Sequence, residues 1–340
     1  MSNPKIFATP DFALNCGETL AELSLAYETW GALAADGDNA ILLLHGYTSN
    51  THAGGAGGWW EGLIGPGRAI DTDRYFVVCP NMPGSSYGST GPMSIDPETG
   101  KPYGSNFPDI ATEDMVEAQR LLIDSLGIGQ LAAVIGYSYG GTLTFLWGVT
   151  HPDRMRALVP VASGIKNRRD PSVVEQLTER FAGLPGWIGG DHYGEDGTQG
   201  EGIFEAMVEQ RLETLRGYGM AKELFDKTGD KDEAERQLTA IAEDWARRFD
   251  PNSLIVLRRA AVRFDAETGA ERIKAPVLYV LATTDSLFPP DLGPPTVAKL
   301  QGFGVDATYF ELDSPYGHRA PAADWQKWAG ALNDFLNRHT

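Results

Sequence analysis

The sequence predicts an α/β fold in which a mostly parallel central sheet carries an inserted helical cap. Three observations lead to this prediction. Short apolar runs bounded by turn residues alternate with helical patterns through residues 1–165. Between about residues 166 and 265, charge density rises and helical patterns replace the apolar runs. Apolar runs then return, so we expect a core formed by residues 1–165 and 266–340, with the cap at 166–265.

The core elements follow from the apolar runs and their flanking turn residues. A mixed pattern at 19–30, followed by 32–39, predicts an antiparallel hairpin at the sheet edge. A helix is expected at 111–126, with Asp109 as its cap and Gly127 as its left-handed end. The expected parallel strands are 41–44, 75–79, 131–135, 158–161, 277–282 and 307–312.

The cap and the final helix follow from helical periodicity. We expect cap helices at 173–181, 202–215 and 232–249, with a Gly-rich, mobile loop at 189–202. The last helix is expected at 322–336, where the core-facing side chains are Trp325, Trp328, Leu332 and Phe335.

Amphipathic cap helices leave apolar side chains that need a second surface. We expect them either to form a homodimer interface through the cap or to pack on the core. These side chains are Phe204, Met207, Leu212 and Phe225.

Composition and charge exclude several classes of protein. Hydrophobic residues at 42% and charged residues at 22% are typical of a globular protein. The 28 basic and 46 acidic residues give a net charge of −18, which disfavours nucleic acid and membrane surfaces as partners. Neither a signal peptide nor a membrane span is evident, so we expect a cytoplasmic protein. Cys16 and Cys79 are too few for a disulfide framework, and we expect both to be buried, reduced thiols.

A candidate nucleophile stands in the segment Gly136–Gly140, which fits G-x-S-x-G around Ser138. Ser138 follows an expected strand and precedes a helical segment at 142–150, the setting that an exposed nucleophilic serine requires. A second match at 84–88 contains Ser86 but has no helix after it. The structural alternative is that the glycines only tighten a strand-to-helix crossover while Ser138 caps the helix.

The serine needs a general base and a carboxylate that orients the base. His318 lies in a turn just past the last expected strand, whereas His151, His192 and His339 each have an ordinary structural explanation. Asp285 follows the expected strand at 277–282 and is the candidate acid. Asp313 is the weaker alternative, because it is only five positions from His318.

Backbone amides are expected to stabilise the oxyanion. The candidates are the amide of Tyr139, after the serine, and that of Tyr47, in the loop after the first parallel strand. His45 and His52 lie in or near this loop, but no nearby acid or cysteine completes a ligand set, so neither a metal nor a cofactor is expected. His45 is expected to hydrogen-bond the loop.

Several long motifs resemble one known family. They lie at 25–31, 58–60 with 64–67, 71–76, 88–92, 100–105, 248–250 with 252–253, and 316–318. On these motifs the chain resembles the homoserine O-acetyltransferase family of α/β-hydrolases over nearly its whole length. The resemblance implies an α/β-hydrolase fold with Ser138 as nucleophile, Asp285 as acid, His318 as base and Tyr47 as oxyanion donor. It also implies a dimer.

The departures from the family concern the substrate. Members usually have a small residue before the serine and an Asp after the histidine, where this chain has Tyr137 and Arg319. A Tyr-Arg pair of the family's cap reads Leu215-Arg216 here. We therefore take these four residues as candidate substrate contacts. The family's Asp is positioned to pair with a substrate ammonium group, so the resemblance implies poor binding of homoserine.

Arg319 either faces the substrate or pairs with a surface acid such as Asp324. The leading hypothesis from the sequence is a serine esterase that hydrolyses short, uncharged acetate esters through an acyl-enzyme. Some members of the resembling family look like such esterases. The alternative is an acetyl-CoA-dependent O-acetyltransferase acting on an alcohol such as homoserine. A catalytically inactive binding protein is the third class.

Overall fold

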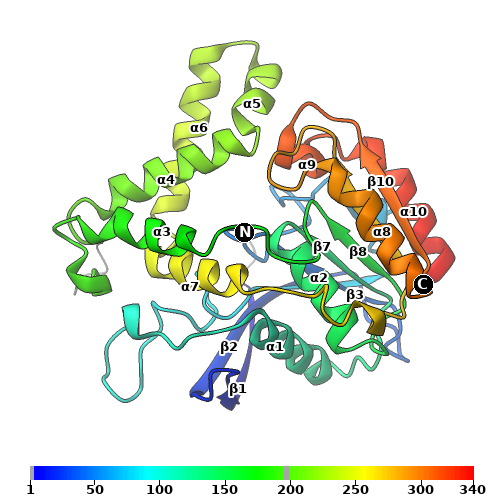
Figure 1. The fold of residues 1–340 in the computed structure, drawn as a ribbon, viewed down its shortest axis with the longest axis horizontal. Coiled ribbons are helices and arrows are strands. Elements are labelled where there is room, and N and C mark those ends of the chain that lie inside the picture. Colours follow the sequence, from blue (N-terminus) through cyan, green and yellow to red (C-terminus); the bar gives the residue numbers. More distant parts are fainter. Residues whose placement is uncertain (1–3, 195–198) are drawn as a thin grey trace.

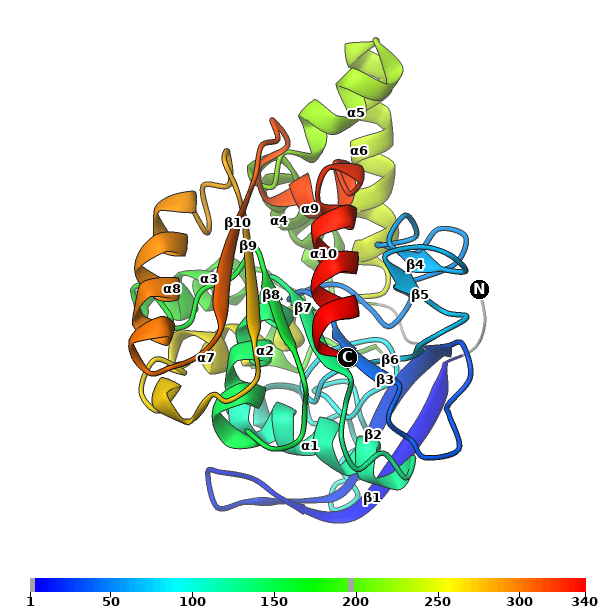
Figure 2. The same ribbon diagram turned by 90° about the vertical axis from the view of Figure 1, so that its right-hand side faces the viewer.

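The computed structural model describes residues 4–194 and 199–340. Its strands are β1 (Lys5–Ala13), β2 (Thr19–Trp30), β3 (Ala40–Leu44), β4 (Ile64–Gly65), β5 (Ile70–Asp71), β6 (Phe76–Pro80), β7 (Ala133–Tyr137), β8 (Leu158–Val161), β9 (Val277–Ala282) and β10 (Ala307–Leu312). Eight of them form one sheet in the order β1-β2-β6-β3-β7-β8-β9-β10 (Figures 1 and 2). Strand β2 is antiparallel to both its neighbours, and the pairs from β6 to β10 are parallel. The predicted α/β fold is confirmed.

The helices connect the strands and build the cap. They are α1 (Thr112–Ser125), α2 (Tyr139–Thr150), α3 (Ser172–Ala182), α4 (Ile203–Gly217), α5 (Met220–Thr228), α6 (Lys231–Ala246), α7 (Pro251–Val262), α8 (Gly293–Gly302), α9 (Ala320–Ala323) and α10 (Gln326–His339). Figure 2 shows α10 in front of the sheet, on the face opposite α2. Two layers of helices therefore cover the apolar strands.

Two local predictions in the first half of the core were wrong. The edge hairpin pairs β2 with β1, where Pro10 is tolerated because an edge strand has a solvent-facing side; residues 32–39 form no strand. Asp109 does not cap α1. Instead Asp114 accepts a hydrogen bond from the Ala111 amide at 2.8 Å, and Asp109 forms an ion pair with Arg263. Gly127 does adopt the left-handed conformation after α1, with φ 76°.

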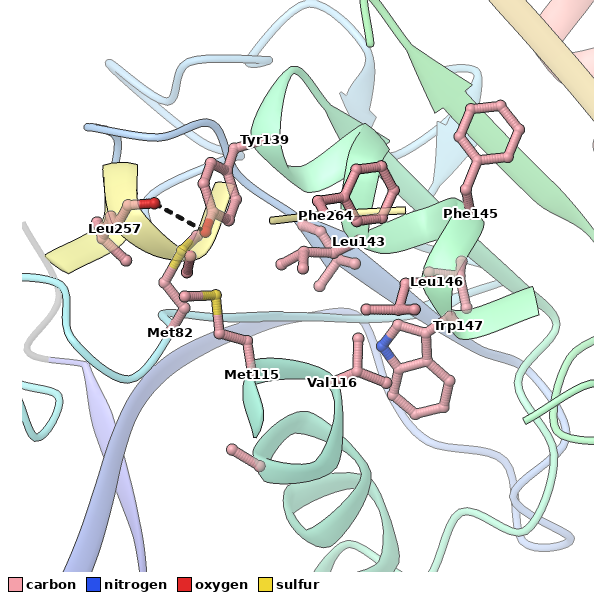
Figure 3. Close-up of a cluster of buried hydrophobic side chains, with 14 of the residues drawn as sticks. Met82, Met115, Val116, Tyr139, Leu143, Phe145, Leu146, Trp147, Leu257 and Phe264 are labelled. Atoms are coloured by element: carbon pink, nitrogen blue, oxygen red, sulfur yellow. Dashed lines mark hydrogen bonds between the residues drawn. The ribbon is translucent and has the colours of Figure 1, made fainter. Parts of the chain in front are cut away.

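Helix α2, which begins directly after the candidate nucleophile Ser138, packs in the core (Figure 3). Its side chains Leu143 and Leu146 are buried against α1 and the segment after α7. The hydroxyl of Tyr139 donates to the Leu257 carbonyl at 3.2 Å, which ties the start of α2 to α7. Packing on several sides fixes the position of the residue that precedes α2, Ser138.

The opposite face is covered by α10 and by the segment that holds β4 and β5. Trp328 and Leu332 are fully buried against this face, and Trp328 meets Trp60 at a ring distance of 5.5 Å. Trp325 was expected to be buried as well, but it precedes the first turn of α10 and is only partly buried, packed against the same cluster. Helical periodicity therefore identified the right face of this helix but not its start.

The segment assigned to the cap contains five helices among the described residues, α3 to α7, and a bridge between Lys166 and Asp265 joins its two ends. Figures 1 and 2 show α5 and the start of α6 extending beyond the sheet. Part of the predicted Gly-rich loop, 195–198, lies outside the described residues. The division into core and cap stays a prediction.

The structure corrects part of the interface prediction. Met207 is fully buried in the main core and is not available to a partner, whereas Leu212 is partly buried and packs inside the cap. Phe204 is partly buried, and only Phe225 of the four is exposed, at 48%. The homodimer stays a prediction.

The last two findings on the fold concern membrane-spanning helices and the two cysteines. No helix in the described part of the chain has both the length and the apolar character to cross a membrane. Both cysteines are free, but only Cys79 is buried; the prediction of a buried Cys16 was wrong because the turn after β1 exposes it.

Candidate active site

Ser138 sits on a strained turn between β7 and α2. Its φ of 59° and ψ of −117° lie in a region that side-chain-bearing residues rarely adopt. Two glycines make the turn possible: a Cβ on Gly136 would lie 2.0 Å from the Gly140 carbonyl oxygen, and a Cβ on Gly140 would lie 2.0 Å from that of Leu44. The Ser138 side chain makes no capping hydrogen bond to α2, which disfavours the structural alternative.

Ser138, Asp285 and His318 follow β7, β9 and β10, and the three side chains meet at the carboxyl edge of the sheet. The Ser138 Oγ lies 2.8 Å from His318 Nε2, and His318 Nδ1 lies 2.7 Å from Asp285 Oδ2. Asp285 Oδ1 accepts hydrogen bonds from the amides of Leu287 and Phe288, at 2.8 and 3.3 Å. The carboxylate is thus fixed, and it holds the imidazole with Nε2 towards the serine. The exposed fractions of Ser138, Asp285 and His318 are 8%, 2% and 1%.

Aromatic rings hold the imidazole of His318 from several sides. The Tyr137 ring stacks on it at 5.2 Å, and the Tyr218 ring lies at 4.7 Å. The Tyr137 hydroxyl also donates to the His318 carbonyl at 2.5 Å. Tyr137 was predicted as a substrate contact. It does line a cavity with Ser138, and it also positions the histidine backbone.

The two amides predicted to stabilise an oxyanion lie beside the serine. Tyr139 is the first residue of α2, and Tyr47 is in the loop after β3. The loop is close, since a Cβ on Gly46 would lie 3.6 Å from the Ser138 Cβ. Among the described residues, neither amide donates a hydrogen bond. Two free N–H groups next to a serine Oγ are suited to stabilising a negatively charged oxygen.

The alternative residues have other partners. Ser86 is buried and its Oγ accepts from the Asp250 amide at 2.9 Å, so it anchors the start of α7. Asp313 is exposed and lies at the strand end, away from the His318 ring. His192 Nε2 lies 2.9 Å from Asp250 Oδ1, which explains its burial.

The remaining histidines also have structural roles. His151 and His339 lie near Glu117 and Asp306, at 4.0 and 3.9 Å. His45 Nδ1 lies 2.8 Å from the Gly46 carbonyl oxygen, as expected for a residue that orders the loop. His52 Nδ1 lies 3.0 Å from Glu28 Oε2. In the described ranges, no three His, Cys, Asp or Glu side chains are grouped as metal ligands would be.

One of the four predicted substrate contacts, Arg216, lies outside the cavities around Ser138, and a second, Arg319, is held in an ion pair. Arg216 is exposed and forms an ion pair with Glu235 on α6, so its assignment to the substrate site was wrong. The α-helical period turns Leu215 inward instead, where it lines a cavity of about 80 Å³ together with Ser138. Arg319 lines the same cavity, but its ion-pair partner is Glu223 of α5, at 3.0 Å. Asp324 pairs with Lys327.

Four residues that the sequence did not indicate line the cavities around Ser138. Arg211 lies in α4 and Tyr218 directly follows α4. Arg258 lies in α7, and Arg169 precedes α3. Burial lowers the pKa of Arg211. Basic residues on cap segments are common, so no sequence signal distinguished these from surface charges.

Comparisons with known proteins agree with this geometry. A family profile described as alpha/beta hydrolase fold matches residues 39–320. Homoserine O-acetyltransferase from Geobacter sulfurreducens is 37% identical, over 96% of this chain and 95% of the relative. Two solved structures have a TM-score of 0.87. Esterase E22 is 26% identical, covering 98% of this chain and 99% of the other; homoserine O-acetyltransferase from Bacillus anthracis is 27% identical, covering 98% and 97%.

Proposed function

Because the chain belongs to the homoserine O-acetyltransferase family of α/β-hydrolases, we propose that it transfers a short acyl group to an alcohol through an acyl-enzyme on Ser138. The observation that carries the proposal is the buried series of hydrogen bonds from Ser138 through His318 to Asp285. The similarity to acetyltransferases over 96% of the chain supports an alcohol as the acyl acceptor.

The first half-reaction acylates the serine. His318 Nε2 accepts the proton of Ser138 Oγ as that oxygen attacks the carbonyl carbon of an acyl donor such as acetyl-CoA. The carbonyl oxygen becomes negatively charged and receives hydrogen bonds from the amides of Tyr47 and Tyr139. The bond to the leaving group then breaks, the leaving group takes the proton from His318, and the acyl group stays on Ser138.

The second half-reaction uses the same groups in reverse order. An alcohol loses its proton to His318 Nε2 as its oxygen attacks the acyl carbonyl carbon. The tetrahedral intermediate collapses, Ser138 Oγ leaves and recovers the proton, and the new ester departs. Asp285 stays ionised throughout and stabilises the imidazolium that forms in each half-reaction.

Hydrolysis of short acetate esters is the second candidate function, with water taking the place of the alcohol. The similarity to esterase E22, at a TM-score of 0.87 and 26% identity, favours it. Sequence alone led us to expect hydrolysis first. The transferases among the more similar relatives now support transfer better.

Neither function requires homoserine itself. Arg319 lies directly after His318, and its guanidinium is paired with Glu223. Among the described residues that line the three cavities at or beside the site, the only carboxylate is Glu213, and Arg180 holds both of its oxygens. A substrate ammonium group would meet cations and no available anion. We therefore propose an acceptor alcohol without an ammonium group.

The test separates the two acyl acceptors. The protein is incubated with acetyl-CoA, alone and with a panel of small alcohols, and both thiol release and ester formation are measured. If the enzyme transfers the acyl group to an alcohol, thiol release should depend on the alcohol, and the amount of thiol released should equal the amount of ester formed. If thiol release is independent of every alcohol and matches acetate formation, the enzyme is a hydrolase. The Ser138→Ala variant provides the blank.

A further inference from the structure

Four arginines without carboxylate partners line the cavities at or beside Ser138. Three of them, Arg169, Arg211 and Arg258, line the largest of these cavities, and Arg168 lines a smaller one. Arg169, Arg211 and Arg258 form no ion pair within 4 Å with any described residue, although the chain has 46 acidic residues against 28 basic ones. Other arginines in the cap, such as Arg180 and Arg216, do have carboxylate partners. In so acidic a chain, three unpaired guanidiniums in one place require an explanation.

The three side chains converge from different parts of the cap. One cavity of about 270 Å³ is lined by all three, and a second of about 100 Å³ is lined by Ser138 together with Arg169 and Arg258. Tyr47 and Tyr218 line both cavities, so the two adjoin. Arg211 also lines the cavity of about 80 Å³ that contains Ser138 and His318. The cations therefore extend from the cap to the reacting serine.

The contacts of the guanidiniums hold them in place and leave donors free. Arg211 stacks over Trp245 at 4.9 Å and donates from Nη1 to the Thr48 Oγ1 at 2.7 Å, but its buried Nε has no hydrogen-bond partner among the described residues. Arg258 lies over the Tyr47 ring at 4.7 Å. Arg169 is exposed at the edge of the cavities. A buried N–H without an acceptor costs free energy unless a ligand supplies one.

We propose that Arg169, Arg211 and Arg258 bind a carboxylate carried by the alcohol that Ser138 acylates or releases. This rests on the proposed acyl transfer and names its substrate class: a small hydroxycarboxylate, or its acyl ester, without an amino group. Guanidinium groups suit the planar carboxylate because they can donate two parallel hydrogen bonds to it. The small volumes of the cavities suit an alcohol of a few carbon atoms.

The experiment compares matched pairs of acceptors. Hydroxycarboxylates of two to four carbons and their primary amides differ by one charge but have nearly the same shape. We expect kcat/KM to favour the best carboxylate over its amide by about tenfold or more, because the amide leaves the guanidiniums unpaired. In the double variant Arg211→Gln, Arg258→Gln, the ratio should fall to about one. The ratio is measured within each protein, so a reduced folded fraction does not affect it.

Arg216→Gln is the matched control, since it removes the same charge from α4 at a position outside the cavities; its ratio should equal that of the wild type. Equal use of carboxylate and amide by the wild type would overturn the inference. So would a double variant that keeps the ratio while its KM rises for acetyl-CoA and not for p-nitrophenyl acetate, which would assign the cations to donor phosphates.

A third readout separates this inference from the proposed function. A burst of p-nitrophenol that is absent in Ser138→Ala reports the acyl-enzyme itself. A burst without carboxylate preference would overturn the inference and leave acyl transfer standing. Absence of both burst and turnover would overturn the proposed function.

Discussion

The guanidinium of Arg319 lies 3.0 Å from a carboxylate oxygen of Glu223, which joins the turn that holds His318 to helix α5 of the cap. The Arg319 amide also donates to the Tyr218 carbonyl at 3.0 Å. Glu223 has a side chain only 5% exposed and forms a second ion pair with Lys227. The side chain next to His318 thus both links the cap to this turn and contributes a positive charge to the cavity that contains Ser138.

Removing the charge of Glu223 should destabilise the protein at neutral pH. We expect Glu223→Gln to lower the free energy of unfolding by about 1–3 kcal/mol, below the full value for a buried pair because Arg319 is partly exposed. Thermal or denaturant unfolding measures the difference. Lys222→Gln, which removes an ion pair at the exposed surface of the same helix, should leave the stability nearly unchanged.

The effect of Glu223 should disappear in acid. Burial alone would raise the pKa of this carboxyl, but the Arg319 and Lys227 cations outweigh burial and lower the pKa below its ordinary value. The stabilisation is therefore complete above the unfolded pKa of about 4.3 and is lost as the pH falls through the lower, folded pKa. The difference in Tm between wild type and Glu223→Gln should shrink between about pH 7 and about pH 3. A difference that stays constant would contradict this assignment.

Reversing the charge at Arg319 should change which acceptor is used. In the double variant Arg319→Asp, Glu223→Gln, an unpaired carboxylate follows His318, and we expect the ratio of kcat/KM for homoserine over its analogue without the amino group to rise by about tenfold or more. Glu223→Gln alone is the control, because it frees the Arg319 cation and should lower the ratio. A wild type that prefers homoserine would contradict the assigned role of Arg319.

The glycines of the turn at Ser138 should not tolerate a methyl group. A Cβ on Gly140 would lie 2.0 Å from a backbone oxygen of β3, so Gly140→Ala must displace the strand or the nucleophile. We expect a loss of about 3 kcal/mol or more in stability, or a protein that does not fold. A Cβ on Gly129 would meet nothing within 4 Å, and Gly129→Ala is the control. Equal stability of the two variants would show that the turn is less constrained than its geometry indicates.

Substitutions at Ser138, His318 and Asp285 should lower the rate of turnover, whereas substitution of Ser86 should lower only the stability. Ser138→Ala or His318→Ala should lower kcat by about 10⁶, and Asp285→Asn by about 10⁴, because the imidazole loses its orienting charge. Ser86→Ala should keep its activity and lose about 1 kcal/mol of stability, since the Asp250 amide loses its acceptor. An inactive but folded Ser86→Ala would contradict the choice of Ser138.

The sequence was most informative about polar residues that come shortly after a buried strand. Ser138, Asp285 and His318 each come just after an apolar run, and parallel strands bring their carboxyl ends to one edge of the sheet, so the three could be predicted together. Helices α5 and α7 were not predicted, and α7 is apolar on several faces. Periodicity cannot identify a helix that is buried all round.

The contacts of the cap could not be predicted for a different reason. Arg319 meets Glu223, and Arg211 meets Trp245, across elements that only the tertiary packing brings together. The sequence supplied many acids as possible partners for Arg319, and Asp324 was chosen for its nearness along the chain. The assignment of Arg216 to the substrate site failed for the same reason. Helical periodicity alone did not show that Leu215 faces the cavity and Arg216 the solvent.

The most direct test of the account is to locate the acyl group after a single turnover. The protein is mixed with acetyl-CoA or p-nitrophenyl acetate, quenched in acid within the burst phase, and digested for peptide mass spectrometry. The account predicts acetylation of the Ser138 hydroxyl, absent in Ser138→Ala and lost again when a competent alcohol is added before the quench. Turnover without any acetyl group on Ser138, or with the group on Ser86, would contradict it.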